Sequence, residues 1–332
     1  MLYRCTRPFL FMLSPECAHD VTLKGLSVLS KCHLLPKNTP DSSQSARVMG
    51  LDFPSRVGLA AGLDKNAQYI EGLGRLGFGF IEVGTVTPLP QEGNPKPRLF
   101  RLTHEKAVIN RMGFNNQGLE RMIPRLINRR WPGILGVNIG KNKITPNDKA
   151  VNDYLTGLRA VYPYADYVTV NISSPNTPDL RALQDEKALF ELLTALKSAQ
   201  AQLQSEQGRR VPMVVKVAPD LGKRDIQVIS KVLLDCEIEG LIATNTTVER
   251  PLKTALAKPI TGGLSGAPLF ESSTDVLKQF SDHLQGKVAI IASGGIDSND
   301  AAQAKRAAGA DLVQLYTGLI YNGPALIKSI TF

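Results

Sequence analysis

The densest set of polar side chains in the sequence lies in the segment 171–178, which reads NISSPNTP. Asn171 and Asn176 each offer one amide acceptor and two donors, and they flank the hydroxyls of Ser173 and Ser174. A local turn stabilised by Asn or Ser side chains would explain one or two of these residues, but not the whole set. Such amides suit a neutral heterocycle with alternating C=O and N–H edges better than a phosphate or a simple acid. The segment therefore predicts a site for a ring of this kind.

Three glycine-rich segments indicate a second kind of ligand group. They read ASGGI at 292–296, YTG at 316–318 and GGLSG at 262–266. Backbone N–H groups of such loops, together with a helix N-terminus, often hold a phosphate. Each segment alone is compatible with a tight turn, but three segments in adjoining loops favour phosphate binding. We therefore predict a phosphorylated ligand.

Two other patterns have weaker claims to chemistry. The segment 72–77 reads GLGRLG and matches a dinucleotide-binding fingerprint. That motif requires a strand before it and a helix after it, whereas here a helical stretch precedes and a strand follows. We interpret it as a helix C-terminus and turn. Lys65 is a candidate for an aldolase-type imine, but such a lysine usually needs apolar surroundings, and the neighbouring Asp64 argues against it.

The polar residues fall at the ends of short apolar runs rich in Val, Ile and Ala. Eight such runs occur, at 57–60, 78–83, 134–139, 167–172, 213–217, 240–244, 288–292 and 311–316. Stretches with helical periodicity lie between them, for example 186–204 and 225–234. Alternating strands and helices predict a parallel sheet. Eight units favour an α/β fold of the (β/α)8 TIM-barrel type over a doubly wound open sheet.

The strand ends support the barrel. Amides and lysines are prominent among the residues that follow or close the runs, which are Lys65, Thr85, Asn138, Asn171, Lys216, Thr244, Asn245, Gly294, Gly295, Tyr316 and Thr317. Barrel enzymes place their chemistry at the carboxyl ends of the strands. The pattern therefore favours one central site. The stretch 86–114 is dense in Pro and Gly, and we expect it to be a long insertion after the second strand.

Composition narrows the possible partners. The chain has 332 residues, 43% of them hydrophobic and 21% charged, which is typical of a globular protein with a full core and excludes disorder and fibres. A net charge of +9 favours anionic partners. Only 6% of residues are aromatic, and the longest basic runs are pairs such as Arg129–Arg130, so nucleic acid is not an expected partner.

The cysteines and histidines carry no sign of a metal site or a disulfide framework. The four cysteines show no C-x-x-C spacing, which favours a reducing compartment. His33, His104 and His283 have no metal-ligand spacing, and we predict no metal. No apolar run approaches the roughly 20 residues that span a bilayer. We predict neither a signal peptide nor a mitochondrial transit peptide.

Residues 1–37 differ from the rest of the chain. Two short helices are expected, around 8–16 and 17–33, and five basic residues stand against two acidic ones. A basic amphipathic pair of helices can lie on a membrane surface. A helical cap on the main domain is an equally open interpretation. The polar stretch 38–45 follows and is expected to be a linker to the barrel.

Further motifs make a family resemblance specific. They read AAGLDK at 60–65, NRMGFNN at 110–116, GVNIGKN at 136–142, VKVAPD at 215–220 and ATNTT at 243–247. Together with the segment 171–178, they make the chain resemble the class 2, quinone-dependent dihydroorotate dehydrogenases, from Ser14 to Pro324. The resemblance implies FMN-dependent oxidation of dihydroorotate to orotate in de novo pyrimidine (UMP) biosynthesis, with a membrane quinone as electron acceptor.

The resemblance also implies roles for individual residues. It places the base that removes the C5 proton at Ser174, where class 1 enzymes have a cysteine, and Thr177 is a nearby hydroxyl. The implied substrate-binding residues are Lys65, Asn110, Arg111, Met112, Gly113, Phe114, Asn171, Asn176, Asn245 and Thr246. The implied FMN-binding residues are Ala61, Gly62, Lys65, Thr85, Asn138, Asn171, Lys216, Thr244, Gly266, Gly295, Tyr316 and Thr317. A cation at Lys216 would stabilise the negative charge of reduced flavin.

The N-terminal segment fits the same resemblance. Class 2 enzymes carry an N-terminal helical extension that shapes a quinone tunnel, and His19 and Arg101 occupy positions that resemble tunnel-lining residues. We thus expect a quinone-facing segment at 1–37, an FMN-binding barrel at 38–332, and peripheral association with the cytoplasmic face of the inner membrane. The alternative is a soluble FMN oxidoreductase that acts on a related pyrimidine with another acceptor. Two further alternatives, a barrel aldolase or isomerase and a non-catalytic barrel, need no flavin. The yellow colour of a purified flavoprotein would distinguish the first two functions from these.

Overall fold

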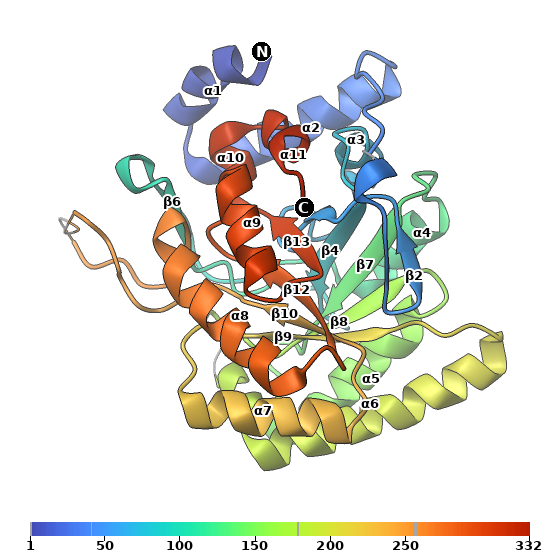
Figure 1. Cartoon of the computed structure of the whole chain (residues 1–332). Coiled ribbons are helices and arrows are strands. Elements are labelled where there is room, and N and C mark those ends of the chain that lie inside the picture. Colours follow the sequence, from blue (N-terminus) through green and yellow to red (C-terminus); the bar gives the residue numbers. More distant parts are fainter. Residues whose placement is uncertain (1, 41, 178, 255, 257) are drawn as a thin grey trace.

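The eight predicted strands form a closed parallel barrel. A computed structural model describes residues 2–40, 42–177, 179–254, 256 and 258–332. The barrel order is β10-β12-β13-β3-β4-β7-β8-β9, which confirms the (β/α)8 fold and excludes the open sheet (Figure 1). The strands are β3 Val57–Leu59, β4 Phe80–Val86, β7 Ile134–Ile139, β8 Tyr167–Asn171, β9 Met213–Val217, β10 Gly240–Ala243, β12 Ala289–Ser293 and β13 Leu312–Leu315.

Helices surround the barrel, so the strands are buried on both faces and read as continuous apolar runs. The helices are α3 Ile70–Gly74, α4 Gly118–Ile127, α5 Ala150–Val161, α6 Glu186–Gln207, α7 Lys223–Asp235, α8 Phe270–Leu284, α9 Asn299–Ala307, α10 Thr317–Asn322 and α11 Ala325–Ser329. The predicted helices at 186–204 and 225–234 correspond to α6 and α7. The segment 72–77 is the end of α3 and a turn before β4, as predicted, and Gly77 has a φ of +103°.

A hairpin closes the amino-terminal end of the barrel. It consists of β1 Ala46–Val48 and β2 Leu51–Phe53, which pair antiparallel. Phe53 meets Phe80 edge to face at a centroid distance of 5.2 Å inside an apolar cluster. The predicted linker 38–45 leads into this hairpin through the short helix η1 Ser42–Gln44, and Asp41 lies outside the described residues. With this end plugged by apolar side chains, the polar strand ends at the opposite end form the accessible site.

The predicted insertion after the second barrel strand forms a small sheet of its own. Strands β5 Leu99–Leu102 and β6 Ala107–Asn110 are joined by the short helix η2 Thr103–Glu105. Strand β11 Gly263–Gly266, from the loop after β10, pairs antiparallel with β6, giving the order β11-β6-β5. This sheet brings Asn110 and the glycine-rich segment 262–266 together, although they are far apart in the sequence.

The N-terminal segment forms two helices docked on the barrel. They are α1 Leu2–Met12 and α2 Pro15–Lys31, so the helix junction falls at 13–14 and the predicted boundary at 16–17 was wrong. Pro15 explains the difference, because the residue before a proline disfavours helical backbone and Ser14 has a ψ of 147°. Leu23 of α2 is 3% exposed and belongs to the main core. Tyr3 Oη donates to the Ile320 carbonyl at 2.5 Å, which ties α1 to α10.

No helix among the described residues is both long enough and apolar enough to cross a membrane.

Candidate active site

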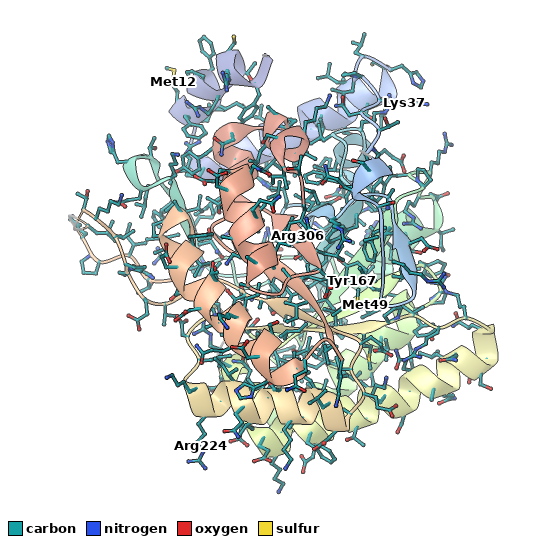
Figure 2. All side chains as sticks on the ribbon, viewed as in Figure 1. Met12, Lys37, Met49, Tyr167, Arg224 and Arg306 are labelled. Carbon is teal, nitrogen blue, oxygen red and sulfur yellow. The ribbon has the colours of Figure 1, made fainter. Side chains whose placement is uncertain are left out.

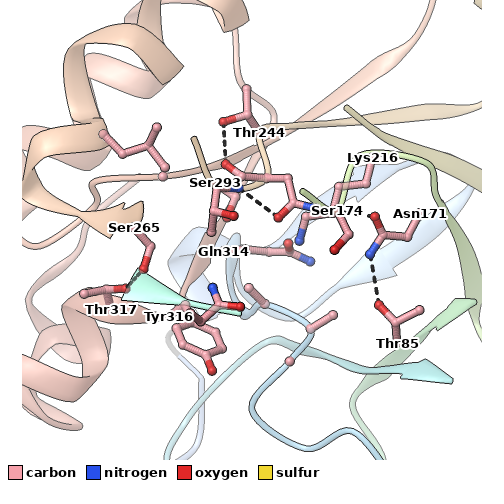
Figure 3. Close-up of a pocket in the computed structure, with 18 of the residues that line it drawn as sticks. Thr85, Asn171, Ser174, Lys216, Thr244, Ser265, Ser293, Gln314, Tyr316 and Thr317 are labelled. Carbon is pink, nitrogen blue, oxygen red and sulfur yellow. Dashed lines mark hydrogen bonds between the residues drawn. The ribbon is translucent and has the colours of Figure 1, made fainter. Parts of the chain in front are cut away.

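A polar cavity lies at the carboxyl ends of the barrel strands, as the strand-end residues predict (Figure 3). Its volume, including the mouth, is about 1010 Å³. The predicted residues that line it are Ala61, Gly62, Lys65, Thr85, Asn110, Gly113, Phe114, Asn171, Ser174, Asn176, Lys216, Thr244, Asn245, Thr246, Gly266, Gly295, Tyr316 and Thr317. Residues predicted from separate motifs, spread from 61 to 317, therefore meet around one space.

Three of the predicted substrate-binding and FMN-binding residues lie outside this lining. Arg111 turns to the surface, where its guanidinium donates to the Pro97 carbonyl at 2.8 Å and stacks over the Phe100 ring. Met112 uses its backbone carbonyl to accept from Asn94 N. Asn138 is fully buried directly behind the cavity, where it contacts Thr85 and Asn171. Of the three, Asn138 alone is hydrogen-bonded to residues that line the cavity. Asn138 can therefore act on the site only through Thr85 and Asn171.

A buried carboxylate sets the orientation of the amides behind the cavity. Glu82 of β4 is completely buried. It accepts hydrogen bonds from Asn138 Nδ2 at 2.8 Å, Tyr167 Oη at 3.0 Å, Thr169 Oγ1 at 3.1 Å and Gln314 Nε2 at 2.8 Å. Because Asn138 donates to Glu82, its Oδ1 faces the other way and accepts from Thr85 Oγ1 at 2.5 Å. The donor and acceptor ends of this amide are thereby fixed.

The predicted amide and hydroxyl cluster gathers on one side of the cavity. Asn171 Nδ2 donates to Thr85 Oγ1 at 2.9 Å, a bond drawn in Figure 3. Asn245 Nδ2 donates to Ser173 Oγ at 3.0 Å, and Asn176 Nδ2 donates to Asn110 Oδ1 at 3.0 Å. These side chains come from β4 and β8, from the loops after β8 and β10, and from the insertion, so the cluster depends on the closed barrel. Amide groups of the cluster that face the cavity can form hydrogen bonds with the alternating C=O and N–H groups of a ring.

Ser174 faces the cavity with only a backbone partner. The N–H of Asn176 donates to Ser174 Oγ at 3.2 Å. Within the described residues no His, Asp or Glu side chain is hydrogen-bonded to this hydroxyl. Thr177 is 5% exposed, and its Oγ1 has no hydrogen-bond partner in the part of the chain that the structure describes. Pro178, the last residue of the predicted segment, lies outside the described residues.

Two lysines bring positive charge to the cavity without a direct counter-ion. Burial lowers the pKa of Lys216 below its usual value, and the Glu82 carboxylate partly opposes this shift. Burial, reinforced by Arg98, lowers the pKa of Lys65 to about 8. Neither lysine forms an ion pair with a described residue. Each is therefore available to an anionic or electron-rich group in the cavity.

The opposite side of the cavity is a cradle of glycines. A Cβ at Gly295 would collide with Phe270, and one at Gly318 would collide with the Ile296 carbonyl. Thr317 Oγ1 donates to Ser265 Oγ at 2.8 Å and joins two of the three predicted loops (Figure 3). The three glycine-rich segments thus adjoin, as the phosphate prediction requires.

Sequence reasoning missed one polar residue of the lining. Gln314 of β13 donates its Nε2 to Glu82, and its Oε1 is buried with no partner among the described residues. The available signal was a polar residue in the middle of an apolar strand, which applies to Glu82 as well. Ala60, Ser265, Leu269, Ser293, Gly294, Ile296 and Gly318 complete the lining, mostly within motifs already singled out.

A second cavity of opposite character lies between the N-terminal helices and the barrel. Its volume is about 1020 Å³, and leucines from α1, α2, α3 and β5 form much of its wall. The predicted tunnel residues His19 and Arg101 both line it. Burial and the charge of Lys65 lower the pKa of His19 to about 4, so this imidazole is neutral at physiological pH. Tyr316 lines both cavities.

The described residues contain no group of three or more His, Cys, Asp or Glu side chains placed to hold a metal ion. Cys5, Cys17 and Cys32 are exposed and Cys236 is buried, all as free thiols.

The closed barrel and its polar cavity at the carboxyl ends of the strands define a (β/α)8-barrel enzyme. A sequence model of the dihydroorotate dehydrogenase family matches residues 43–331. The chain is 54% identical to a dihydroorotate dehydrogenase (quinone) of Acinetobacter baumannii, covering 99% of this chain and 98% of that one. It is 54% identical to another of Nitrosomonas eutropha, covering 100% and 97%.

A crystal structure of DHODH from Eimeria tenella in complex with ferulenol superposes with a TM-score of 0.88 at 42% identity, covering 95% of this chain and 89% of that one. The chain belongs to the dihydroorotate dehydrogenase family and, within it, to the quinone-dependent class 2. The family uses a flavin. The class predicted from the motifs is therefore confirmed.

Proposed function

We propose that the polar cavity holds FMN and dihydroorotate and that the apolar cavity holds the quinone that takes up the electrons. The observation that carries this proposal is the pair of cavities that share Tyr316. One cavity offers amides, a hydroxyl and cations, and the other offers leucines. This division suits a polar substrate on one side and a lipid-soluble acceptor on the other.

The residues of the polar cavity fit FMN. Gly266, Gly295 and Gly318 present backbone rather than side chains to the cavity, which suits a phosphate held by N–H groups. The unpartnered Gln314 Oε1 can accept from a ring N–H. Lys216 and Lys65 supply positive charge beside the ring, where FMN, when bound, accepts a hydride and gains negative charge. Thr85, Asn171 and Thr244 complete its surroundings, and Asn138 acts from behind them.

The substrate is proposed to lie against the amide cluster. Asn110, Asn176 and Asn245 present donors and acceptors to the C=O and N–H edge of the pyrimidine ring. Lys65 can pair with the substrate carboxylate. Gly113 and Phe114 close the site, whereas Arg111 and Met112 hold the surrounding loop in place rather than touching the substrate.

Ser174 is proposed to accept the C5 proton of dihydroorotate. A serine hydroxyl is a weak base, so its proton must pass to another group as it accepts one. The unpartnered hydroxyl of Thr177, three residues further on, is a suitable next member of such a relay. The backbone bond from Asn176 N holds Ser174 Oγ in position while leaving its own proton free to be donated.

The apolar cavity is proposed to hold the quinone, with His19 and Arg101 at its polar positions. Because His19 is neutral at physiological pH, it can donate one hydrogen bond to a quinone oxygen without placing a charge in an apolar space. Arg101 retains its charge. Electrons need to pass only the wall at Tyr316 to reach this cavity.

The N-terminal segment 1–37 is proposed to face a membrane, with the barrel 38–332 behind it. Large apolar side chains are exposed on α1 and α2, among them Phe9 at 72%, Met12 at 83% and Val28 at 59%. In Figure 2 Met12 projects from the outer surface of α1, at the end of the molecule that α1 and α2 form. Exposed apolar side chains beside basic ones suit a surface of anionic lipid, as on the cytoplasmic face of an inner membrane.

Turnover with different acceptors tests this proposal against the soluble alternative. The purified chain should be yellow, release FMN on denaturation, and convert dihydroorotate to orotate with a long-chain quinone. Fumarate and NAD should support little turnover. Phe9→Ser with Met12→Ser should reduce binding to anionic vesicles while leaving reduction by dihydroorotate intact, and Ile144→Ser, an equally exposed apolar side chain at 82% on the barrel, is the matched control. Equal turnover with fumarate or NAD would support the soluble alternative instead.

A further inference from the structure

A buried lysine lies between α8 and α9, outside both cavities. Lys305 is 0% exposed. Its Nζ donates to Ser273 Oγ at 2.6 Å and lies 3.5 Å from the Phe270 carbonyl. It forms no ion pair with any residue that the structure describes. Buried charges in proteins are normally paired, so an unpaired lysine here indicates that its counter-charge is not among the described residues.

Ser273 connects this lysine to one of the glycine-rich loops. Ser273 Oγ lies 3.1 Å from both the Gly294 carbonyl and the Phe270 carbonyl. The Phe270 carbonyl already accepts from Thr274 Oγ1 at 2.6 Å. Because Lys305 donates to Ser273, the single hydroxyl proton of Ser273 is free for Gly294. Two consecutive hydrogen bonds therefore link the Lys305 ammonium to the loop that follows β12.

The bond to Gly294 determines which way the next peptide group points. In a trans peptide, the C=O and the following N–H point in opposite directions. With the Gly294 carbonyl held toward α8, the N–H of Gly295 is directed to the opposite side, where both glycines line the polar cavity. Among the described residues no backbone carbonyl accepts from this N–H. It is therefore a free donor at the glycine cradle.

We propose that Lys305 and Ser273 form a positioning pair for the cofactor phosphate. The pair holds the Gly294 carbonyl so that the Gly295 N–H points at the phosphate, and it places a positive charge behind the loop. The phosphate supplies the counter-charge that Lys305 does not find among the described residues. This inference rests on the proposed function, in which the glycine-rich loops hold the phosphate of FMN.

The charges around Lys305 make its protonation sensitive to that phosphate. Burial lowers the pKa of Lys305 to about 7, and Glu271 at the start of α8 opposes the shift. Strand β13, which also packs against α9, carries no charged residue, and α9 itself adds Asp300 and Arg306. A phosphate dianion on the cavity side of the loop favours the protonated form of Lys305. The advantage that Lys305 gives to phosphate binding should thus grow as pH falls through about 7.

Comparing FMN with riboflavin isolates the phosphate, because riboflavin has the same ring and no phosphate. The full-length chain, freed of flavin, is titrated with each ligand and binding is followed by quenching of flavin fluorescence. Lys305→Met should weaken FMN binding roughly tenfold, which corresponds to about 1.4 kcal/mol. Riboflavin binding should change less than twofold. Ser273→Ala should show the same selectivity with a smaller loss.

Ser230→Ala is the matched control, since Ser230 is also a buried helical serine, at 2% exposure, and donates only to the Ile226 carbonyl of its own helix. It should leave both affinities unchanged. Equal losses of FMN and riboflavin affinity in Lys305→Met and Ser273→Ala, or no loss of either, would overturn the inference. The ratio of wild-type to Lys305→Met affinity for FMN should rise from pH 8 to pH 6. A wild-type chain with no preference for FMN over riboflavin would instead contradict the proposed cofactor.

Discussion

Arg101 does more in the structure than line the apolar cavity, and its replacement should release α1. Its guanidinium donates to three backbone carbonyls at and just after the end of α1, those of Leu10 at 3.3 Å, Phe11 at 3.1 Å and Leu13. It also stacks over the Phe11 ring at 4.5 Å. The last carbonyls of a helix have no partner within the helix, so Arg101 serves as the C-terminal cap of α1 from another part of the chain.

The expected size of the effect follows from these contacts. Three hydrogen bonds at roughly 1 kcal/mol each, together with a cation–π contact of about 0.5 kcal/mol, give about 3.5 kcal/mol of local docking free energy. Losing it should raise the undocked population of α1 about three hundredfold. In Arg101→Met, the amide hydrogens of residues 2–13 should thus exchange with solvent much faster than in wild type at the same pH. Amides of α6, on the far side of the barrel, should be unaffected.

Two comparisons make this prediction decisive. Arg101→Lys keeps the charge but cannot span three carbonyls, so it should show an intermediate exchange rate. Arg47→Met is the control, because Arg47 pairs with Asp52 on the surface with both side chains more than three-quarters exposed. Exchange in residues 2–13 that stays at the wild-type rate in Arg101→Met would refute the capping role. The role of Arg101 would then be confined to the apolar cavity, where the quinone is proposed to bind.

Three further changes test single residues. Ser174→Ala should keep its flavin but slow flavin reduction by dihydroorotate by roughly 10²–10⁴-fold, with quinone reoxidation unchanged; stopped-flow absorbance measures both, and a defect confined to Ser173→Ala would reassign the base. Lys216→Met should lower flavin retention or slow flavin reduction, and unchanged flavin content with unchanged kinetics would exclude that role. The pKa of His19 is about 4 in the folded chain, below its unfolded value of 6.5, so this residue contributes stability above pH 6.5 that is lost as pH falls toward 4. The midpoint of thermal unfolding should therefore fall more over that range in wild type than in His19→Gln. Parallel curves of midpoint against pH would contradict this assignment.

The barrel could be predicted because the sequence gives two signals for each strand, an apolar run and a polar or glycine residue at or near its end. The run 213–217 is apolar except at Lys216, which lies next to its end and lines the polar cavity, so burial and chemistry point to the same element. The start of α2 was placed wrongly because the apolar periodicity continues across Ser14. Pro15 was the stronger signal, since it ends one helix and begins the next.

The site was predictable wherever a motif supplies the side chain directly. Asn171, Asn176 and Asn245 were found because amides are unusual at the ends of buried strands. Gln314 was missed because its role depends on Glu82, which comes from a strand more than two hundred residues away in the sequence. The capping role of Arg101 was missed for the same reason, since the carbonyls that it contacts are defined only once α1 docks.

Anaerobic mixing in two steps tests the central claim, that one chain oxidises dihydroorotate in the polar cavity and passes the electrons to quinone in the apolar one. Dihydroorotate added without oxygen should bleach the visible flavin absorbance and yield one orotate per flavin. A long-chain quinone added next should restore the absorbance completely. Flavin that stays oxidised after the first addition, or stays reduced after the second, would contradict the account.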